Sequence, residues 1–314
     1  MPEVPTAQRC LAITGPTACG KTDLALELAT EFPIEIISMD SAIVFRGMDI
    51  GTAKPEGEIR NGIPHHLVDI LDPEQNYSAG RFAADTLDLI SEINARGKLA
   101  LIVGGTMLYL RALREGIANL PDRDPEVRAA IDARAAEQGW PALHAELAHV
   151  DAEAAARIDP ADKQRIQRAL EVHELTGLSL SQLQQETLQP GLDVEAVALV
   201  PEDRAALAAH IASRFDSMLE QGFADEVRRL YQRPGLTADC TSMRAVGYRQ
   251  LWAWLDGEFG LAEARERAVA ATRQLAKRQL TWLRSDQASE KLAADDSGNL
   301  QLLRERVSRA LDSA

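Results

Sequence analysis

The feature that most restricts the fold of this chain is a glycine-rich loop with the pattern G-x-x-x-x-G-K-T at residues 15–22. An apolar run at residues 11–13 precedes the loop, and a run with helical periodicity at residues 23–29 follows it. A strand that enters such a loop and a helix that leaves it form the context in which this pattern binds phosphate. Backbone N–H groups turn toward the phosphate oxygens there, and the start of the helix adds positive charge. We therefore expect a phosphate-binding loop at the first strand-to-helix connection.

Two residues at the end of this loop carry specific chemistry. Lys21 supplies a positive charge, and Thr22 offers a hydroxyl group to a phosphate oxygen or to a Mg²⁺ ion. The flanking strand and helix disfavour the alternative of a glycine-rich turn without a ligand. The loop alone does not tell whether the phosphates belong to a nucleotide or to another compound. The predicted ligand contacts are Gly15, Pro16, Thr17, Ala18, Cys19, Gly20, Lys21 and Thr22.

The hydrophobic pattern predicts strands that alternate with helices. Apolar runs at residues 10–14, 34–38 and 99–103 are separated by helical patterns, as in parallel βαβ units. A fourth run at residues 196–200 follows a long helical interval. The chain therefore predicts an α/β fold, with a P-loop NTPase-like parallel sheet core and an inserted all-helical domain. We expect the core at residues 1–120 and 191–286, the insertion at 121–190 and a C-terminal tail at 287–314.

Composition restricts the partners of the chain. The 34 Lys and Arg residues and 48 Asp and Glu residues give a formal net charge of −14, which on average opposes binding to a nucleic-acid backbone. Basic residues nevertheless gather around residues 163–168 and 273–278. Taken by themselves, these groups are more typical of solvated helix faces than of a nucleic-acid surface.

Other features indicate a cytoplasmic protein. No apolar stretch reaches the roughly 18 to 20 residues that span a bilayer, and residues 1–5 lack the basic and apolar regions of a signal peptide. The three cysteines have no metal-ligand spacing and no even number for disulfides, which suits a reducing compartment. We expect no membrane partner, and we expect a monomer.

Polar residues follow two of the predicted strands. Asp40 comes shortly after residues 34–38, and Thr106 follows Gly104 and Gly105. Ligands of an open parallel sheet bind at the carboxyl ends of its strands, so both side chains are candidate site residues. Asp40 is a candidate base, and capping of a following helix or pairing with an arginine explains it equally well. No core strand ends in the acidic residue typical of a phosphate-loop hydrolase except the one that leads to Asp40, which disfavours an ATPase.

Five motifs, taken in order, closely resemble those of the tRNA dimethylallyltransferase family. The likeness extends over nearly the whole chain, as far as residue 284. Several long motifs in the same order are more specific than the phosphate loop alone. The motifs occupy residues 15–22, 36–42, 46–55, 103–109 and 273–279.

The resemblance implies transfer of a dimethylallyl group from its diphosphate to N6 of adenosine 37, beside the anticodon, in tRNAs that read codons beginning with U. It implies that the loop holds the diphosphate leaving group rather than ATP, and that Mg²⁺ is required. It also implies that Asp40 accepts the N6 proton, with Thr106 and Arg214 beside the reacting centre. The expected partners are dimethylallyl diphosphate and the tRNA anticodon stem-loop, which the helical insertion grips.

By family position, contacts to tRNA fall on five stretches of the chain. Residues 244–249 among them combine two guanidinium groups, an aromatic ring and a glycine, a composition suited to an unstacked RNA loop. Two other functions remain open, namely a small-molecule or nucleotide kinase and a nucleotide-dependent RNA-binding protein without catalysis. The predicted contacts are Asp40, Ser41, Ala42, Ile43, Thr106, Arg128, Gln164, Arg165, Ile166, Gln167, Arg168, Arg244, Ala245, Val246, Gly247, Tyr248 and Arg249.

Overall fold

The computed structural model describes residues 9–55, 57, 62–116, 118, 120–186 and 191–312. The chain divides into two compact units, one of residues 1–111 and 193–314 and the other of residues 112–192. The insertion expected at residues 121–190 falls inside the second unit. Within the described ranges, no helix combines the length and the apolar character that a membrane crossing requires.

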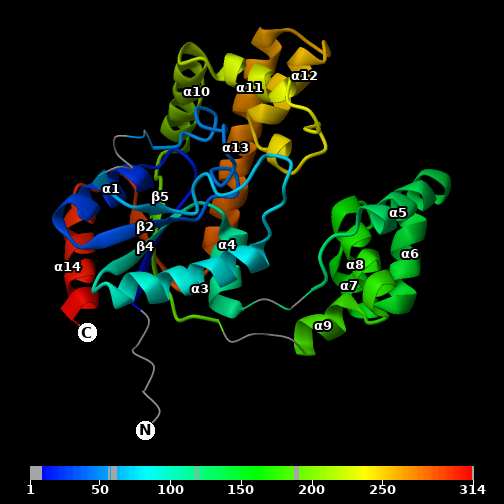
Figure 1. Ribbon diagram of the computed structural model, residues 1–314, viewed down its shortest axis with the longest axis horizontal. Coiled ribbons are helices and arrows are strands. Elements are labelled where there is room, and N and C mark those ends of the chain that lie inside the picture. Colours follow the sequence, from blue (N-terminus) through cyan, green and yellow to red (C-terminus); the bar gives the residue numbers. More distant parts are fainter. Residues whose placement is uncertain are drawn as a thin grey trace. The chain divides into compact units, whose positions relative to one another are not determined.

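A parallel sheet of six strands forms the centre of the first unit (Figure 1). The four predicted strands are all present, so the predicted parallel α/β core is confirmed, and the sheet has one further strand at each edge. Strand β1 is central, with Cys10 beside Ala100 of one neighbour and Leu11 beside Glu195 of the other. The spatial order is β3 (His65–His66), β2 (Ile34–Ser38), β4 (Leu99–Gly104), β1 (Cys10–Thr14), β5 (Glu195–Val200) and β6 (Ser289–Ala293).

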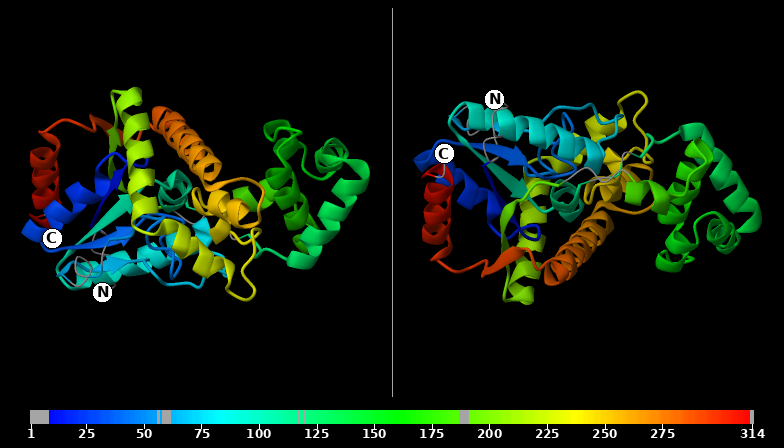
Figure 2. Two further views of the ribbon diagram at one scale, coloured as in Figure 1. Left: turned by 90° about the horizontal axis from the view of Figure 1, so that it is seen from above. Right: turned by 90° about the horizontal axis from the view of Figure 1, so that it is seen from below.

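Both faces of the central strands are buried, as parallel sheets require. On one face, Leu11 and Ile13 pack in a cluster with residues of α1 (Lys21–Glu31) and α14 (Asn299–Asp312). Figure 2 shows these two helices side by side, α1 in blue and α14 in red. On the opposite face, Ala198 packs against the start of α4 (Met107–Glu115) and the end of α13 (Leu261–Ser285).

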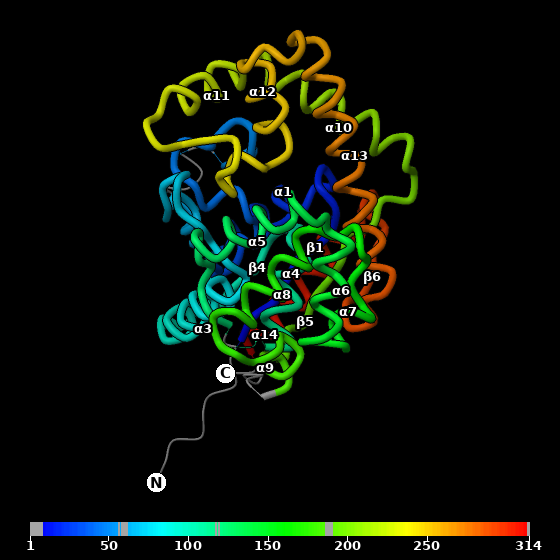
Figure 3. The backbone as a smooth tube through the Cα atoms, turned by 90° about the vertical axis from the view of Figure 1, so that its right-hand side faces the viewer, coloured from blue at the N-terminus to red at the C-terminus, as the bar shows by residue number. Residues whose placement is uncertain are grey.

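The remaining helices of the first unit pack around the sheet and around α13. Helix α12 contacts α11 and α13, and α10 contacts α11 and α13, so these four helices form one group (Figure 3). Helix α3 packs against β2 and β4. The bounds are α3 (Ala79–Ala95), α10 (Arg204–Glu220), α11 (Phe223–Tyr231), the 3₁₀ helix η1 (Ser242–Arg244) and α12 (Tyr248–Leu255).

The second unit consists of helices around its own small core. Ile131, Leu143, Leu147 and Ile166 belong to this core. Asp124 caps the first helix, because its carboxylate accepts the N–H groups of residues 126 and 127. The helices are α5 (Pro125–Gln138), α6 (Trp140–Val150), α7 (Ala152–Arg157), α8 (Lys163–Thr176) and α9 (Leu180–Glu186).

The expected tail at residues 287–314 is wrong, because its described part belongs to the sheet and its covering layer. Strand β6 pairs in parallel with β5, with Ser289 beside Ala196. Leu303 of α14 is fully buried, and Arg304 of the same helix pairs with Glu31 of α1. An edge strand has one neighbour and needs little apolar sequence, so residues 289–293, with the sequence SEKLA, carry no visible strand pattern.

Candidate active site

The loops that follow β2 and β4 are locked together at the carboxyl edge of the sheet. The N–H of Thr106 donates to the carbonyl of Met39 at 3.3 Å, and the hydroxyl of Thr106 accepts the N–H of Ser41 at 3.2 Å. Gly104 permits this approach, since a Cβ atom there would lie 2.1 Å from the Met39 carbonyl oxygen. The structure therefore brings Thr106 and the segment after Asp40 into direct contact.

The predicted phosphate loop connects β1 to α1. Gly20 is the N-cap of α1, and no side chain of the described residues caps that helix start. Uncapped N–H groups at a helix start form an anion-binding site. The ammonium of Lys21 donates to the carbonyl of Pro16 at 2.5 Å and so lies against the loop, while the buried thiol of Cys19 donates to the same oxygen at 3.0 Å. The loop thus has the form and the charge that phosphate binding requires.

Gln279 of α13 joins the phosphate loop to the turn after β4. Its Oε1 accepts the N–H of Thr17 at 3.1 Å, and its Nε2 donates to the carbonyl of Gly105 at 2.8 Å. An amide group can satisfy one donor and one acceptor at the same time. Gln279 is absent from the predicted contacts, and its only signal in the sequence is its place at the end of the motif at residues 273–279.

These loops line one cavity of about 610 Å³. Thr17 and Ala18 of the phosphate loop reach it, as do Asp40 and Thr106. Helices α10 and α13 and residues 244–246 contribute to its walls, and further lining residues are Gly51, Thr52, Phe223 and Tyr248. A cavity of this size accommodates a small ligand together with part of a larger one. The sequence-predicted loop, base and hydroxyl therefore line one shared cavity.

Asp40 both closes a turn and faces this cavity. Its Oδ1 accepts the N–H groups of Ala42 at 2.8 Å and Ile43 at 3.4 Å. Its Oδ2 has no hydrogen-bond partner among the residues that the structure describes. The capping explanation and the functional one are thus compatible, because one oxygen holds the backbone and the other remains for a ligand.

Arg214 of α10 brings a positive charge to the same cavity. Burial lowers the pKa of its guanidinium, while the charges of Asp40 and Asp23 act in the opposite direction. In the described part of the chain, Arg214 makes no hydrogen bond and no ion pair. A half-buried cation without a partner is unfavourable unless a ligand supplies negative charge. Arg214 is therefore well suited to bind an anionic group in the cavity.

Residues 244–249 differ from the expected RNA surface in one respect. Arg244 and Arg249 are exposed, as expected, but Tyr248 has 0% of its surface exposed. The Tyr248 ring lies edge-on to Phe223, with ring centroids 4.9 Å apart, and its hydroxyl donates to Glu226 at 2.6 Å. The expected stacking face for a base is therefore wrong. Composition indicated an aromatic residue, but not that its ring points into the core.

The contacts predicted in the second unit divide into exposed and buried residues. Gln164 and Arg165 are exposed at the start of α8, whereas Ile166 is fully buried in the core of the unit. Gln167 is also buried, and its amide donates to Asp132 at 2.7 Å. The side chains of Ile166 and Gln167 therefore support the helix and do not present a surface to a partner, which corrects that part of the prediction.

Two other arginines of the second unit share one buried carboxylate. The Nε of Arg128 lies 3.0 Å from Oε1 of Glu171, and Nη1 of Arg168 lies 2.8 Å from Oε2 of the same residue. Glu171 is fully buried. Two cations on one anion leave a net positive charge, with both guanidinium groups fixed in place. The arrangement suits phosphate contacts, and Glu171 was not among the residues predicted from the sequence.

The residues at the phosphate loop fit a Mg²⁺ ion that is bound mainly by phosphate oxygens. Thr22 is exposed in the first turn of α1 and offers one hydroxyl ligand. Over the residues described, no cluster of three or more His, Cys, Asp or Glu side chains could hold a metal ion. Mg²⁺ commonly takes one or two protein ligands together with substrate phosphates and water. The donor set is thus compatible with Mg²⁺ carried by a phosphorylated substrate.

A phosphate loop after the central strand, with Asp40 on the same cavity, is the arrangement typical of P-loop enzymes, a class whose sites bind phosphorylated substrates. The family model described as IPP transferase matches residues 43–286. The chain belongs to this IPP transferase family.

Individual relatives agree with this assignment and confirm the resemblance found in the motifs. A tRNA dimethylallyltransferase of Burkholderia cenocepacia strain HI2424 is 56% identical over 286 residues, which cover 90% of this chain and 88% of the relative. The crystal structure of a full-length tRNA isopentenylpyrophosphate transferase from Bacillus halodurans aligns with a TM-score of 0.69, at 38% identity and over 97% of each chain. A eukaryotic dimethylallyltransferase, described as acting on tRNA, aligns with a TM-score of 0.78 at 26% identity, over 97% of this chain and 79% of the other.

Proposed function

We propose that this chain transfers a dimethylallyl group from dimethylallyl diphosphate to N6 of adenosine 37 in tRNAs that read codons beginning with U. The products are N6-(dimethylallyl)adenosine and diphosphate. The observation that carries the proposal is that Asp40 and the phosphate loop line one cavity. The names of the relatives support the choice of tRNA and of the dimethylallyl group.

At the donor end, the chain stabilises the leaving group. The C–O bond of dimethylallyl diphosphate breaks, and negative charge grows on the leaving oxygen. The N–H groups at the start of α1, the ammonium of Lys21 and the guanidinium of Arg214 are the donors available to that charge. Groups preorganised in this way act by electrostatic stabilisation of the transition state. When bound, Mg²⁺ supplies further neutralisation of the diphosphate, and Thr22 is the residue that would hold it.

At the acceptor end, Asp40 compensates for a weak nucleophile. The exocyclic amine of adenine is weak because its lone pair is delocalised into the ring. As the C–N bond forms, Oδ2 of Asp40 accepts the proton that leaves N6, which is general-base catalysis. Thr106 holds the segment after Asp40 through the N–H of Ser41. The acceptor base must leave its stack to reach the cavity, at a cost of a few kcal/mol, which is smallest for an unpaired loop base.

The second unit completes the proposal as the part that grips the anticodon stem-loop. Arg128, Arg168 and the exposed Arg165 supply positive charge for phosphate contacts in a chain of acidic average composition. We expect this binding to weaken as salt rises, since each phosphate contact releases counterions. The cytoplasmic location and the monomeric state expected from the sequence stay predictions.

Incubation with labelled dimethylallyl diphosphate, Mg²⁺ and unmodified tRNA tests the proposal. We expect label in the RNA from the wild type. Asp40→Asn should lose most of this activity while its affinity for tRNA stays within about twofold, because the amide keeps the turn but accepts no proton. A kinase would instead consume ATP, and an RNA-binding protein without catalysis would bind tRNA and transfer nothing.

A further inference from the structure

A buried carboxylate, Glu226 of α11, holds a loop that lines the cavity. Its Oε2 accepts the N–H groups of Asp49 at 3.1 Å and Ile50 at 2.7 Å, and its Oε1 accepts the N–H of Gly51 at 3.3 Å. Only 2% of the surface of Glu226 is exposed. Three consecutive N–H groups that converge in this way form a nest for an anion. Here the anion is a side chain of the protein itself, so the nest fixes the loop.

The same carboxylate also binds the start of α12. The hydroxyl of Tyr248, the first residue of that helix, donates to Oε1 of Glu226 at 2.6 Å. Burial and the negative charge of Glu226 raise the pKa of Tyr248 well above its ordinary value, so the phenol keeps its proton and remains a donor. Glu226 therefore joins two segments that are distant in sequence, residues 49–51 and the segment that ends at Tyr248.

The loop packs so closely on two aromatic rings that Gly51 has no space for a side chain. A Cβ atom on Gly51 would lie 2.1 Å from the ring of Phe223 and 2.6 Å from the ring of Tyr248. Glycine is thus required where the loop lies flat against both rings. The hydrogen bonds of Glu226 and this close contact act on the same part of the loop.

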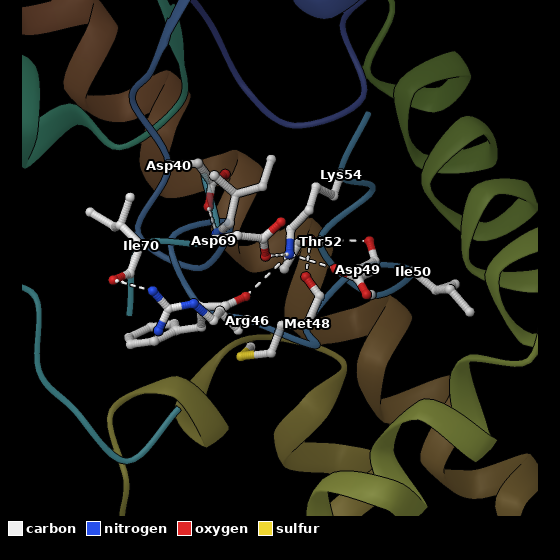
Figure 4. A network of polar contacts seen from close by, with 12 residues as sticks. Asp40, Arg46, Met48, Asp49, Ile50, Thr52, Lys54, Asp69 and Ile70 are labelled. Atoms are coloured by element: carbon white, nitrogen blue, oxygen red, sulfur yellow. Dashed lines mark hydrogen bonds and ion pairs between the residues drawn. The ribbon is translucent and has the colours of Figure 1, made fainter. Parts of the chain in front are cut away.

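The other end of the loop is fixed by a buried lysine. The ammonium of Lys54 donates to Asp49 and to Asp69, each at 2.5 Å, and to the carbonyl of Phe45 at 3.2 Å (Figure 4). Only 2% of the Lys54 side chain is exposed. Gly51, which Glu226 holds, and the following Thr52 lie on the wall of the cavity.

We propose that Glu226 is a positioning residue for the acceptor base, because it sets the separation between the wall at Gly51 and Thr52 and the wall at residues 244–246. It acts through these two walls and does not touch the substrate. None of its hydrogen bonds involves the phosphate loop. Its removal should therefore disturb the RNA side of the cavity and spare the diphosphate side. This inference rests on the proposed function.

Steady-state kinetics with each substrate varied in turn test this role. In Glu226→Gln, an NH₂ group replaces an acceptor and faces a donor, so the two walls shift. We expect kcat/KM for tRNA to fall about 10- to 100-fold, in line with the effect of small misplacements, while KM for dimethylallyl diphosphate stays within about twofold. Tyr248→Phe removes one of the four hydrogen bonds and should cause a smaller loss of the same kind. The control Glu263→Gln alters an exposed carboxylate paired with Arg267 and should change neither constant.

Hydrogen exchange of the amides at residues 49–51 provides a readout that needs no activity. These amides should exchange faster in Glu226→Gln than in the wild type. The proposal is wrong if their exchange is unchanged, or if KM for the diphosphate rises as much as kcat/KM for tRNA falls. Should Glu226→Gln fail to fold, Tyr248→Phe decides by the same criteria. Failure of the wild type to label RNA would overturn the proposed function, whereas normal wild-type transfer with unaltered variants would overturn only the role of Glu226.

Discussion

We expect the side-chain amide of Gln279 to contribute to the rate of transfer, because it joins the phosphate loop to the turn after β4. Gln279→Leu keeps a side chain of similar size but removes the partners of the Thr17 N–H and the Gly105 carbonyl. A polar group left without its partner costs about 1–3 kcal/mol. The lower end of this range applies to Thr17 and Gly105, because both are half-exposed and water can reach them. The two groups together give about 2 kcal/mol, which corresponds to a roughly 30-fold lower rate if the transition state bears the loss.

Single-turnover transfer to tRNA at saturating dimethylallyl diphosphate measures this effect. Gln279→Glu keeps the acceptor for Thr17 but sets an oxygen against the Gly105 carbonyl, so its rate should fall at least as far as that of the leucine variant. Gln274→Leu is the matched control, because Gln274 is exposed on the same helix. A folded Gln279→Leu protein that reacts within twofold of the wild type would refute the idea that Gln279 sets the spacing between the two loops.

Two further predictions concern charge. Arg214→Gln should raise KM for dimethylallyl diphosphate at least about tenfold, because an unpaired cation on the cavity is lost. The affinity for tRNA, measured by filter binding, should not change. An unaltered KM would remove Arg214 from the diphosphate site. Burial raises the pKa of Glu35, but hydrogen bonds from Arg96, His66 and Lys98 outweigh it and lower that pKa from 4.5 to about 2. A depressed pKa stabilises the folded state above the unfolded value and loses this effect as pH falls from about 5 to 2. In thermal unfolding, Glu35→Gln should thus have a lower Tm than the wild type at pH 7, with the gap closing toward pH 3; a gap independent of pH would contradict the assignment.

Much of the fold could be predicted because its signals are local. The phosphate loop lies between a recognisable strand and helix, and the four apolar runs became the four central strands. Residues 289–293 were not predicted to form a strand, because an edge strand needs no apolar run. The α9 helix (Leu180–Glu186) is only seven residues long; it lies within the predicted helical insertion, but its own bounds were not predicted.

The candidate site was predictable where a residue follows directly from a strand end, as with Asp40 and Thr106. Gln279 and Glu226 could not be found in this way, because the backbone groups that they bind are distant in sequence. The separations are 262 and 174 residues for Gln279 and 175 to 177 residues for Glu226. A periodic pattern tells which face of a helix is buried, but not which main-chain groups lie opposite it. For the same reason, Tyr248 looked like a stacking surface until its ring was found against Phe223.

The central claim is that the phosphate loop holds a diphosphate that leaves while Asp40 accepts the proton from the attacking amine. Dimethylallyl diphosphate labelled separately in its carbon chain and in its phosphates tests this claim in one reaction with unmodified tRNA. We predict carbon label in the RNA, one diphosphate released for each group transferred, and at least about a 100-fold slower transfer by Asp40→Asn with unchanged tRNA binding. Phosphate label in the RNA, or a normal rate from Asp40→Asn, would contradict the account.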